Sequence, residues 1–295
     1  MPKKFSIARK SRLIGAVAAS AIALTMLAAC SSGGGAGSSP SATGQGDPGV
    51  TGSTLADIQK RGVINIGVGL TTPPFAIPDS NGNPSGFDID LANQFADFLG
   101  VKANLFEVTG DGRIPALQSG KADAVIFTLT DTPARREQID FSSPYINAWQ
   151  AVGVKADSSI QSISEIADKT IAIQKGTQAS AIVPSAFPNA NIQQYDTEVN
   201  TFTALAQGQA DALVDSSAAL GYHLKTDNSI RILPGLVPGD AIQGYAIGMQ
   251  KGDTTLVDEA NAFMKEFHAK GEGKILYEKW FGNAAPDTFF KGLED

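Results

Sequence analysis

The chain has 295 residues, enough for two domains, and its 42% hydrophobic and 18% charged side chains are an ordinary globular balance. Its formal charge is −7, and because the first 29 residues hold five basic and no acidic side chains, the rest carries −12. That acidity, together with the lack of a basic stripe, argues against a nucleic-acid partner.

The first 29 residues have the pattern of a secretory signal peptide. A basic stretch ends at Arg12, and the apolar run that follows to Ala29 is short for a membrane span. Cys30 is the only cysteine, so no intrachain disulfide is possible. It comes directly after Leu-Ala-Ala, and this tetrapeptide resembles the bacterial lipobox, which implies that Cys30 is lipidated and anchors the protein. A plain signal peptide and a membrane-spanning helix are the alternatives.

Residues 31–54 are rich in Ser, Gly and Pro and have almost no large apolar side chains. This composition predicts a flexible tether between the anchor and the body of the protein. The glycines at 33–35 do not form a phosphate loop, because no strand precedes them and no Gly-Lys-Ser/Thr follows.

The first part of the body alternates strands and helices, which is typical of an α/β unit. The apolar run 63–70 predicts a buried strand, and the turn-rich residues 78–86 separate it from a helix. This helix is expected to begin near Asp88, a good N-cap, and to end at Gly100. A strand, a short helix and a strand follow, at residues 101–108, 114–119 and 122–127.

A second α/β unit with the same alternation begins after residue 150. Ser162-Ile-Ser-Glu165 has the capping-box pattern, which predicts a helix start. Strands are predicted over residues 170–174 and 210–214, each leading into a helix, with another helix at 197–207.

Two segments are expected to cross between these units. Residues 141–154 mix large aromatic side chains with a small apolar run, and residues 241–249 read as a strand that returns to the first unit. After this return, Asp253 is expected to cap a long helix, and a last helix carries the apolar residues between 275 and 281.

A hydroxyl-rich loop follows the strand at 122–127, with threonines at alternate positions from Thr128. Pro133 suits the first turn of a helix, so the segment reads as strand, loop and helix start. The carboxyl ends of strands are where open α/β sheets bind ligands, and Arg135 can hold a carboxylate by two hydrogen bonds. On composition alone, a surface loop with a solvated arginine is the alternative.

Six motifs follow one another along the body of the chain: residues 73–75 (Pro-Pro-Phe), 86–91 (Gly-Phe-Asp-Ile-Asp-Leu), 111–123, 132–145, 174–177 (Gln-Lys-Gly-Thr) and 277–282 (Tyr-Glu-Lys-Trp-Phe-Gly). In this order they resemble the polar amino-acid family of extracellular solute-binding proteins, the receptors of ABC importers. The resemblance runs from about Gly62 to Gly282.

The resemblance implies a two-lobed, periplasmic-binding-protein-like α/β fold with two crossing hinge strands. The first lobe is expected to contain residues 55–150 and 246–295, and the second lobe residues 151–245; a signal peptide (1–29) and a linker with the lipidated cysteine (30–54) precede them. Such a protein binds a polar amino acid or a close analogue in a cleft between the lobes. It then delivers the ligand to a permease in the membrane.

By the same resemblance, Arg135 is the residue that binds the ligand carboxylate, and Thr130 donates a hydroxyl to the ligand nearby. Thr128 stands where many members have glycine, with its backbone carbonyl facing the ligand ammonium. The alternatives are that Arg136 or a surface ion pair accounts for the charge, and that both threonines cap the next helix.

The resemblance assigns further ligand contacts on both sides of the cleft. Phe75 matches the family's aromatic residue whose ring packs on the ligand, and Phe127 is a further candidate, although an aromatic residue at a strand end is more often part of the core. Thr177 lies at a helix start, where free N–H groups and the helix dipole favour an anion. Gln174, from the same motif, and Gln178, directly after it, are included with Thr177 as ligand contacts.

The ammonium position departs from the family pattern. Many members have an aspartate five residues after the first residue of Asp-Ala-Val-Val, and counting from Asp211 this position is Ser216. Asp215 lies one residue earlier. Either Asp215 binds the ammonium through a shifted turn, or the cation is held differently; a third possibility is that Asp215 only caps the next helix.

Little in the sequence suggests catalysis, and no cofactor or metal is expected. His223 and His268 each lie alone in a predicted helix, and capping explains the pair Asp88 and Asp90. We expect a monomer, outside the cytoplasm, that binds a small amino-acid-like ligand and docks on the permease. An exported dehydratase on the same fold and a ligand-sensing subunit of a membrane signalling system are the alternatives.

Overall fold

The computed structural model describes residues 54–293. The predicted signal peptide and the lipidated cysteine lie outside these residues, as does the predicted tether except for its last residue, Thr54. That residue caps the first helix: its side chain accepts a hydrogen bond from the Asp57 N–H, and the Asp57 carboxylate accepts one from the Thr54 N–H.

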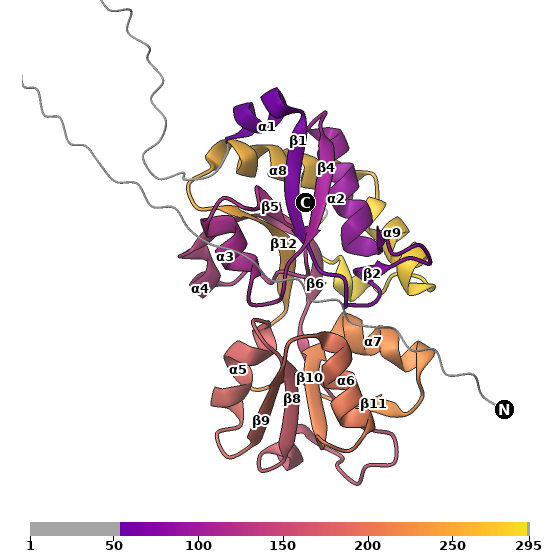
Figure 1. Ribbon diagram of the computed structural model, residues 1–295. Coiled ribbons are helices and arrows are strands. Elements are labelled where there is room, and N and C mark those ends of the chain that lie inside the picture. Colours follow the sequence, from indigo (N-terminus) through magenta and orange to yellow (C-terminus); the bar gives the residue numbers. More distant parts are fainter. Residues whose placement is uncertain (1–53, 294–295) are drawn as a thin grey trace, which may run out of the picture. The chain divides into compact units, whose positions relative to one another are not determined.

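The first sheet takes strands from both ends of the described chain, in the order β4-β1-β5-β12-β6 (Figure 1). β1 pairs in parallel with β4 and β5, whereas β12 pairs antiparallel with β5 and β6. The strands are Val63–Val68 (β1), Lys102–Glu107 (β4), Ala124–Val125 (β5), Ile139–Ala148 (β6) and Gln243–Gln250 (β12). We call this sheet and its helices lobe 1.

Lobe 1 has an apolar core on each face of its sheet. Ile64 and Ile66 of β1 belong to the core formed with α2, α8 and α9, whereas Val125 of β5 belongs to the core formed with α3. A sheet covered on both faces needs apolar side chains on both, which explains the nearly continuous apolar runs in the sequence. The helices are Leu55–Arg61 (α1), Phe87–Phe98 (α2), Arg113–Gln118 (α3), Pro133–Arg136 (α4), Thr254–Ala269 (α8) and Glu272–Phe281 (α9), with the strand pair Ile77–Pro78 (β2) and Pro84–Ser85 (β3) and the 3-10 helix Asp287–Phe289 (η2).

The second sheet has the order β11-β7-β10-β8-β9, and we call it and its helices lobe 2. β8 is parallel to β9 and β10, and β7 is antiparallel to β10 and β11. Its elements are Gln150–Lys155 (β7), Ile163–Ile166 (η1), Thr170–Gln174 (β8), Gln178–Ala186 (α5), Asn191–Tyr195 (β9), Glu198–Ala206 (α6), Ala212–Ser216 (β10), Ser217–Thr226 (α7) and Ile230–Ile232 (β11). β9 and β11 were not predicted from the sequence, because β9 is polar and β11 is only three residues long.

The chain passes between the two sheets at two neighbouring places. Only Trp149 separates β6 of lobe 1 from β7 of lobe 2. The return comes between β11 and β12, and the first residue of β12, Gln243, pairs with Ala148 at the end of β6. The predicted α/β architecture with two lobes and two crossing segments is therefore confirmed.

Local predictions about helix starts had mixed outcomes. Asp253 caps α8 by accepting a bond from the Leu256 N–H, as predicted. Asp88 does not cap α2, because Gly86 holds the cap position and Asp88 lies inside the helix. The capping box at Ser162 is also absent: the Ser162 hydroxyl donates to the Glu165 carboxylate, but the Ser162 side chain accepts no bond from the 3-10 helix.

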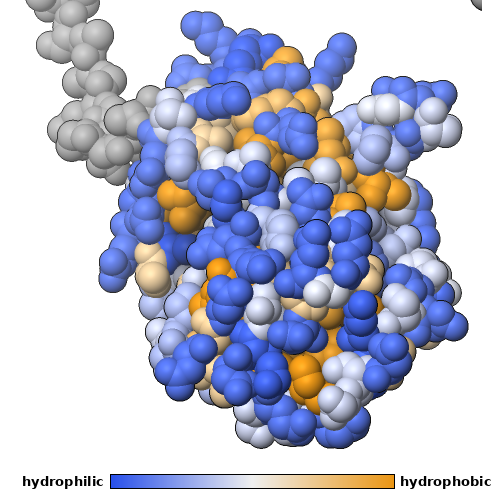
Figure 2. Space-filling view, turned by 60° about the horizontal axis from the view of Figure 1, so that its bottom comes forward, coloured by the Kyte–Doolittle hydropathy of each residue, from blue (hydrophilic) through white to orange (hydrophobic). Residues whose placement is uncertain are grey.

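The face of the molecule in Figure 2 is mostly hydrophilic, with small apolar patches separated by polar side chains. Large apolar side chains are exposed singly, as at Leu236, Ile242 and Ile275, which is normal for a protein surface. No helix within residues 54–293 has the length and apolar character needed to cross a bilayer.

Candidate functional site

A polar cavity lies where the strand ends of both lobes meet. Its volume is ≈ 350 Å³, counting the space that opens to solvent. The lining comes mostly from loops and helix starts that directly follow strands, the usual place for ligands in α/β sheets. The lining residues are Thr72, Thr128, Thr130, Gln150, Gln174, Thr177, Gln178, Glu198, Asp215, Ser216 and Tyr245.

The cavity brings together most of the residues that the sequence singled out. Seven of the ten predicted contacts line it: Thr128, Thr130, Gln174, Thr177, Gln178, Asp215 and Ser216. The other three, Phe75, Phe127 and Arg135, do not. Four further lining residues were not predicted: Thr72, Gln150, Glu198 and Tyr245. Two of the eleven lining residues are acidic and none is basic, so the lining itself favours a cationic group.

The two aromatic candidates do not line the cavity. Phe75 is fully buried and packs edge-on against Phe87, Tyr245 and Phe281. Phe127 lies in the core beside α3, where its ring would overlap any side chain at Gly69. Each ring is therefore held by the packing of lobe 1, which corrects the expectation that they pack on the ligand.

The loop after β5 has a constrained backbone at Thr128. Its φ is +39°, a conformation that glycine adopts more easily than threonine, in keeping with the glycine that the family pattern has there. The Thr128 N–H donates to the Asp88 carboxylate at 2.9 Å, and the Thr128 carbonyl accepts from Arg113 at 3.2 Å. The carbonyl that the resemblance assigned to the ligand ammonium is thus already in a hydrogen bond.

The buried Asp88 carboxylate holds this loop in place by accepting the hydrogen bond from the Thr128 N–H. Burial raises its pKa to about 7, although the bond from Thr128 lowers it. A capping role was predicted for Asp88 because it stands near a helix start, and its bond to a loop forty residues away could not be inferred from that position.

Two guanidinium groups converge on the Gly176 carbonyl of lobe 2. Arg113 donates to it at 2.8 Å and Arg135 at 2.9 Å. Both also hold the loop of lobe 1, since Arg113 donates to the Phe127 carbonyl and Arg135 to the Thr130 carbonyl, at 2.8 and 2.7 Å. Burial lowers the pKa of Arg113 to about 9 and also lowers that of Arg135. The two arginines therefore place positive charge where lobe 2 meets this loop.

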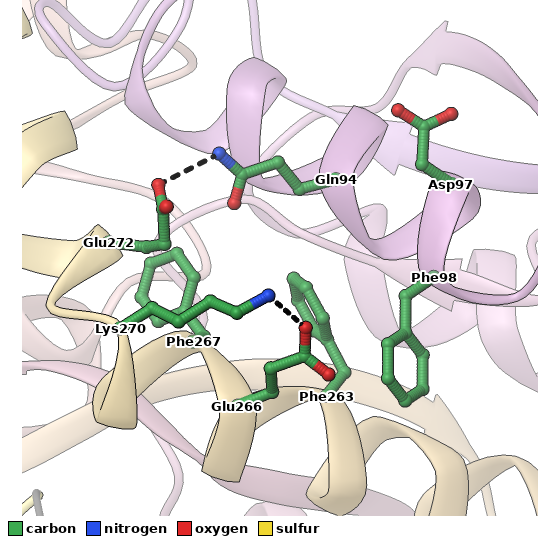
Figure 3. A pocket seen from close by; sticks show the side chains of 8 residues that line it. All are labelled: Gln94, Asp97, Phe98, Phe263, Glu266, Phe267, Lys270 and Glu272. Carbon is green, nitrogen blue, oxygen red and sulfur yellow. Dashed lines mark hydrogen bonds and ion pairs between the residues drawn. The ribbon is translucent and has the colours of Figure 1, made fainter.

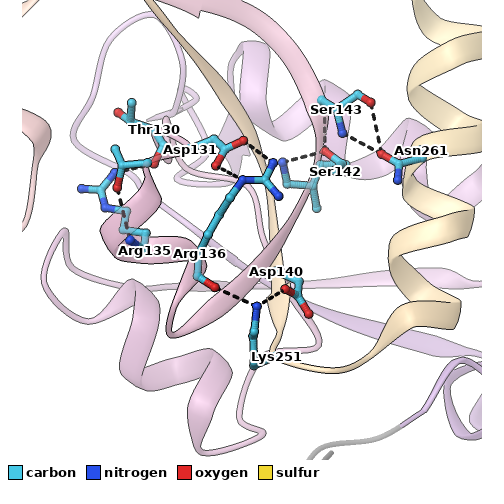
Figure 4. A network of polar contacts seen from close by, with 11 residues as sticks. Thr130, Asp131, Arg135, Arg136, Asp140, Ser142, Ser143, Lys251 and Asn261 are labelled. Atoms are coloured by element: carbon cyan, nitrogen blue, oxygen red, sulfur yellow. Dashed lines mark hydrogen bonds and ion pairs between the residues drawn. The ribbon is translucent and has the colours of Figure 1, made fainter. Parts of the chain in front are cut away.

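Arg136 points away from this position. Its guanidinium donates to Asp131 at 2.6 and 2.5 Å, and its carbonyl accepts from Lys251, which also bonds Asp140 (Figure 4). Thr132, not Thr128 or Thr130, caps α4. The alternatives that Arg136 is the relevant cation and that the two lining threonines are caps are therefore wrong.

In lobe 2, Thr177 is the N-cap of α5 and accepts a bond from the Ser180 N–H. The backbone N–H groups at the start of this helix lie beside the cavity, and the helix dipole favours an anion there. Gln174, at the end of β8, donates to the Asp196 carbonyl at 3.2 Å.

Two buried carboxylates occupy the lobe 2 side of the cavity. Glu198, at the start of α6, is 1% exposed; its Oε1 and the Oδ2 of Asp215 are buried and make no hydrogen bond within the described residues. Burial raises the pKa of both carboxyls well above the usual range, and Glu198 raises that of Asp215 further. Ser216 accepts the bond from the Ala219 N–H, so Ser216 caps α7 and the capping role considered for Asp215 is wrong.

His223 lies behind Glu198. Its Nε2 is 3.4 Å from Glu198 Oε1, and its ring stacks on Phe202. Burial lowers the pKa of His223, so the imidazole is neutral near pH 7 and does not balance the carboxylate. His268 instead bonds the Pro144 carbonyl, and no group of three metal-ligating side chains occurs among residues 54–293.

A second hollow lies between α2, α8 and α9, away from the strand ends (Figure 3). Its floor is apolar, with Phe263 and Phe267. Four of its five polar side chains pair with one another, since Gln94 donates to Glu272 and Lys270 to Glu266. Because these groups are satisfied and lie at the surface, the cavity between the lobes is the better candidate for a ligand site.

Known proteins resemble the chain closely along its body. The family model for bacterial extracellular solute-binding proteins, family 3, matches residues 64–283. The ABC transporter glutamine-binding protein GlnH of Bacillus subtilis (strain 168) is 36% identical over 267 residues, 88% of this chain and 94% of the relative. The L-cystine-binding protein TcyJ of Escherichia coli (strain K12) is 30% identical over 233 residues, 77% of this chain and 86% of the relative.

Among solved structures, the ancestral amino acid-binding protein AncCDT-1, a precursor of cyclohexadienyl dehydratase, superposes with a TM-score of 0.72 at 36% identity. The match covers 78% of this chain and all of that one. The lobes, the cavity and the matched residues agree with one assignment: the chain belongs to the bacterial extracellular solute-binding proteins, family 3.

Proposed function

We propose that the cavity binds an α-amino acid between the two lobes. The carrying observation is the separation of charge around it: two guanidinium groups, neither of which lines the cavity itself, donate to the Gly176 carbonyl, and two buried carboxyls of lobe 2 each have one oxygen without a hydrogen bond within the described residues. An unpaired buried charge is costly, and a zwitterion would compensate both ends at once. Membership of an extracellular family places the protein outside the cytoplasm, as the substrate-binding component of an ABC importer.

The ligand carboxylate is assigned to Arg135, Thr130 and the start of α5 at Thr177. Arg135 uses one N–H for the Thr130 carbonyl and one for the Gly176 carbonyl, and a guanidinium has five N–H groups, so others can reach a carboxylate. Asp215 is assigned to the α-ammonium, through the Oδ2 atom that makes no other bond.

The remaining predicted residues line the cavity as polar neighbours of the ligand: Thr128, Gln174, Gln178 and Ser216. The lobe boundaries at residues 150/151 and 245/246, the monomeric state and delivery of the ligand to a membrane permease belong to the same proposal. The relatives GlnH and TcyJ are a glutamine-binding and an L-cystine-binding protein, which supports an amino-acid ligand for this cavity.

The test is a thermal-shift screen of the purified protein against the amino acids, followed by calorimetric titration of every hit. A ligand at 100 times its Kd should add about 2.7 kcal/mol to the free energy of unfolding. Because one similar structure is a dehydratase precursor, prephenate and arogenate should be incubated with the protein and the products assayed. Product formation without amino-acid binding would contradict the proposed binding function and indicate a dehydratase instead.

Closure of the lobes should depend on a close contact at Gly110. A Cβ on this lobe 1 residue would lie 2.6 Å from the Lys175 carbonyl of lobe 2, too close for any side chain. Gly110→Ala should therefore disfavour the closed form and weaken ligand binding about fivefold, because the binding-competent population falls. Gly221→Ala, inside α7, is the control for a new side chain without this contact, since its backbone is helical and nothing lies within 4 Å of its added Cβ. Equal ligand affinities of Gly110→Ala and wild type in calorimetry would contradict a role of the Gly110 contact in lobe closure.

The lipid anchor is tested at Cys30, which follows Leu-Ala-Ala and lies outside the described residues. Cys30→Ala should release the protein from the membrane fraction into the medium or periplasm while ligand affinity stays the same, because Cys30 is the only residue that can carry the thioether-linked lipid. Fractionation with immunoblotting measures the change. A mutant that stays in the membrane fraction would remove lipidation as the anchor.

A further inference from the structure

The lobe 2 side of the cavity holds one carboxylate more than an α-ammonium requires. Glu198 and Asp215 both line the cavity, and no basic residue lines it with them. Each has one buried oxygen without a hydrogen bond within the described residues. A zwitterionic ligand with a neutral side chain would pair with one of these carboxylates and leave the other buried and uncompensated.

The position of Glu198 at the start of α6 does not account for its burial. A carboxylate in the first turn of a helix is favoured by the helix dipole, but that gain is small and does not need burial. Thr197 already caps α6 through the Asn200 N–H. Glu198 is 1% exposed, so it bears the cost of desolvation without a partner for Oε1. Such a cost indicates a partner that arrives with the ligand.

Within residues 54–293, the groups near Glu198 bring no positive charge to it. His223 Nε2 is the near nitrogen, at 3.4 Å, but burial keeps the imidazole neutral near pH 7. Tyr245 lines the same cavity with a pKa raised by burial, so its phenol is neutral as well. Arg113 and Arg135 are engaged at Gly176, on the side assigned to the ligand carboxylate.

We propose that Glu198 is a specificity-determining residue that binds a second cationic group of the ligand, so that the cavity selects amino acids with a basic side chain. The inference rests on the proposed function and on the assignment of Asp215 to the α-ammonium. An ammonium or guanidinium can donate to Glu198 Oε1, whereas an amide or ureido group brings hydrogen-bond donors without the charge. A carboxylate in the side chain of the ligand would be repelled.

The experiment compares arginine with citrulline, which has nearly the same shape but a neutral ureido group, by calorimetric titration. Wild type should bind arginine at least about tenfold more tightly than citrulline. Glu198→Gln should bring this ratio below about threefold, mainly by weakening arginine. Glu165→Gln, at an exposed glutamate also near the start of a short helix, should leave the ratio unchanged.

The outcomes separate the two proposals. If no amino acid binds, the proposed function fails. If amino acids bind but citrulline and glutamine bind wild type as tightly as arginine, the function stands and the role of Glu198 is overturned, a result that does not depend on any variant folding. A wild-type preference for arginine that Glu198→Gln leaves intact also overturns it, with circular dichroism showing that the variant is folded.

Discussion

Arg135→Ala is expected to weaken amino-acid binding by about 2–5 kcal/mol, because it removes a charged partner of the ligand carboxylate inside a closed cavity. The guanidinium also donates to the carbonyls of Thr130 in lobe 1 and Gly176 in lobe 2, so its loss takes away one link that joins the closed lobes. Both effects act in the same direction. Calorimetric titration of wild type and variant with the same ligand measures the difference.

Arg136→Ala is the matched control, because it removes the same side chain one residue later. Arg136 pairs with Asp131, and its side chain is 52% exposed, so the ion pair contributes little and binding should change less than twofold. Arg135→Lys should fall between the two, since it keeps the charge but loses the fork of N–H groups. A larger loss for Arg136→Ala than for Arg135→Ala would show that the carboxylate assignment is wrong.

The fold could be predicted from sequence because its signals are local and repeated. Apolar runs such as 63–70 and 170–174 need burial on both faces, and these produced the correct α/β alternation. The caps that were predicted from single residues were less reliable. The prediction that Asp253 caps a helix was confirmed, whereas Asp88 is a buried acceptor for the N–H of Thr128, far away in the sequence. A carboxylate near a helix start has the same local pattern in both roles.

The site was predicted best where a motif fixes the spacing of its residues. Thr128 and Thr130 after β5, and Gln174 and Thr177 of the Gln-Lys-Gly-Thr motif, line the cavity, since each lies at or just after a strand end. Glu198 and Arg113 gave no comparable signal. Their roles depend on burial and on contacts between lobes, and an isolated glutamate or arginine in a helical segment is usually a solvated residue. Phe75 shows the opposite error: its position in the motif predicted a ligand contact, but its ring is packed in the core.

Asp215→Asn is expected to weaken the binding of every α-amino acid at least about tenfold, or 1.4 kcal/mol. Asp215 Oδ2 is buried without a hydrogen bond, while Oδ1 accepts from the Ser216 N–H at 2.6 Å, so one oxygen is held in place and the other is available to an ammonium. Asparagine keeps the shape and loses the charge. The loss should be similar for glutamine and arginine, unlike the loss expected from Glu198→Gln, because the α-ammonium is common to both ligands.

Ser216→Ala separates binding from stability. Ser216 caps α7, so its loss should lower the free energy of unfolding by about 0.5–2 kcal/mol and change affinity less than Asp215→Asn does. Asp215→Asn should leave the melting temperature of the unliganded protein equal or higher, because a neutral amide replaces a buried carboxyl whose pKa burial raises. Thermal melting measures the stability of each variant, and calorimetric titration measures its ligand affinity. An Asp215→Asn protein that binds as tightly as wild type would mean that the ammonium is held elsewhere or that the ligand has none, and the amino-acid assignment would then fall while the fold and the family remain.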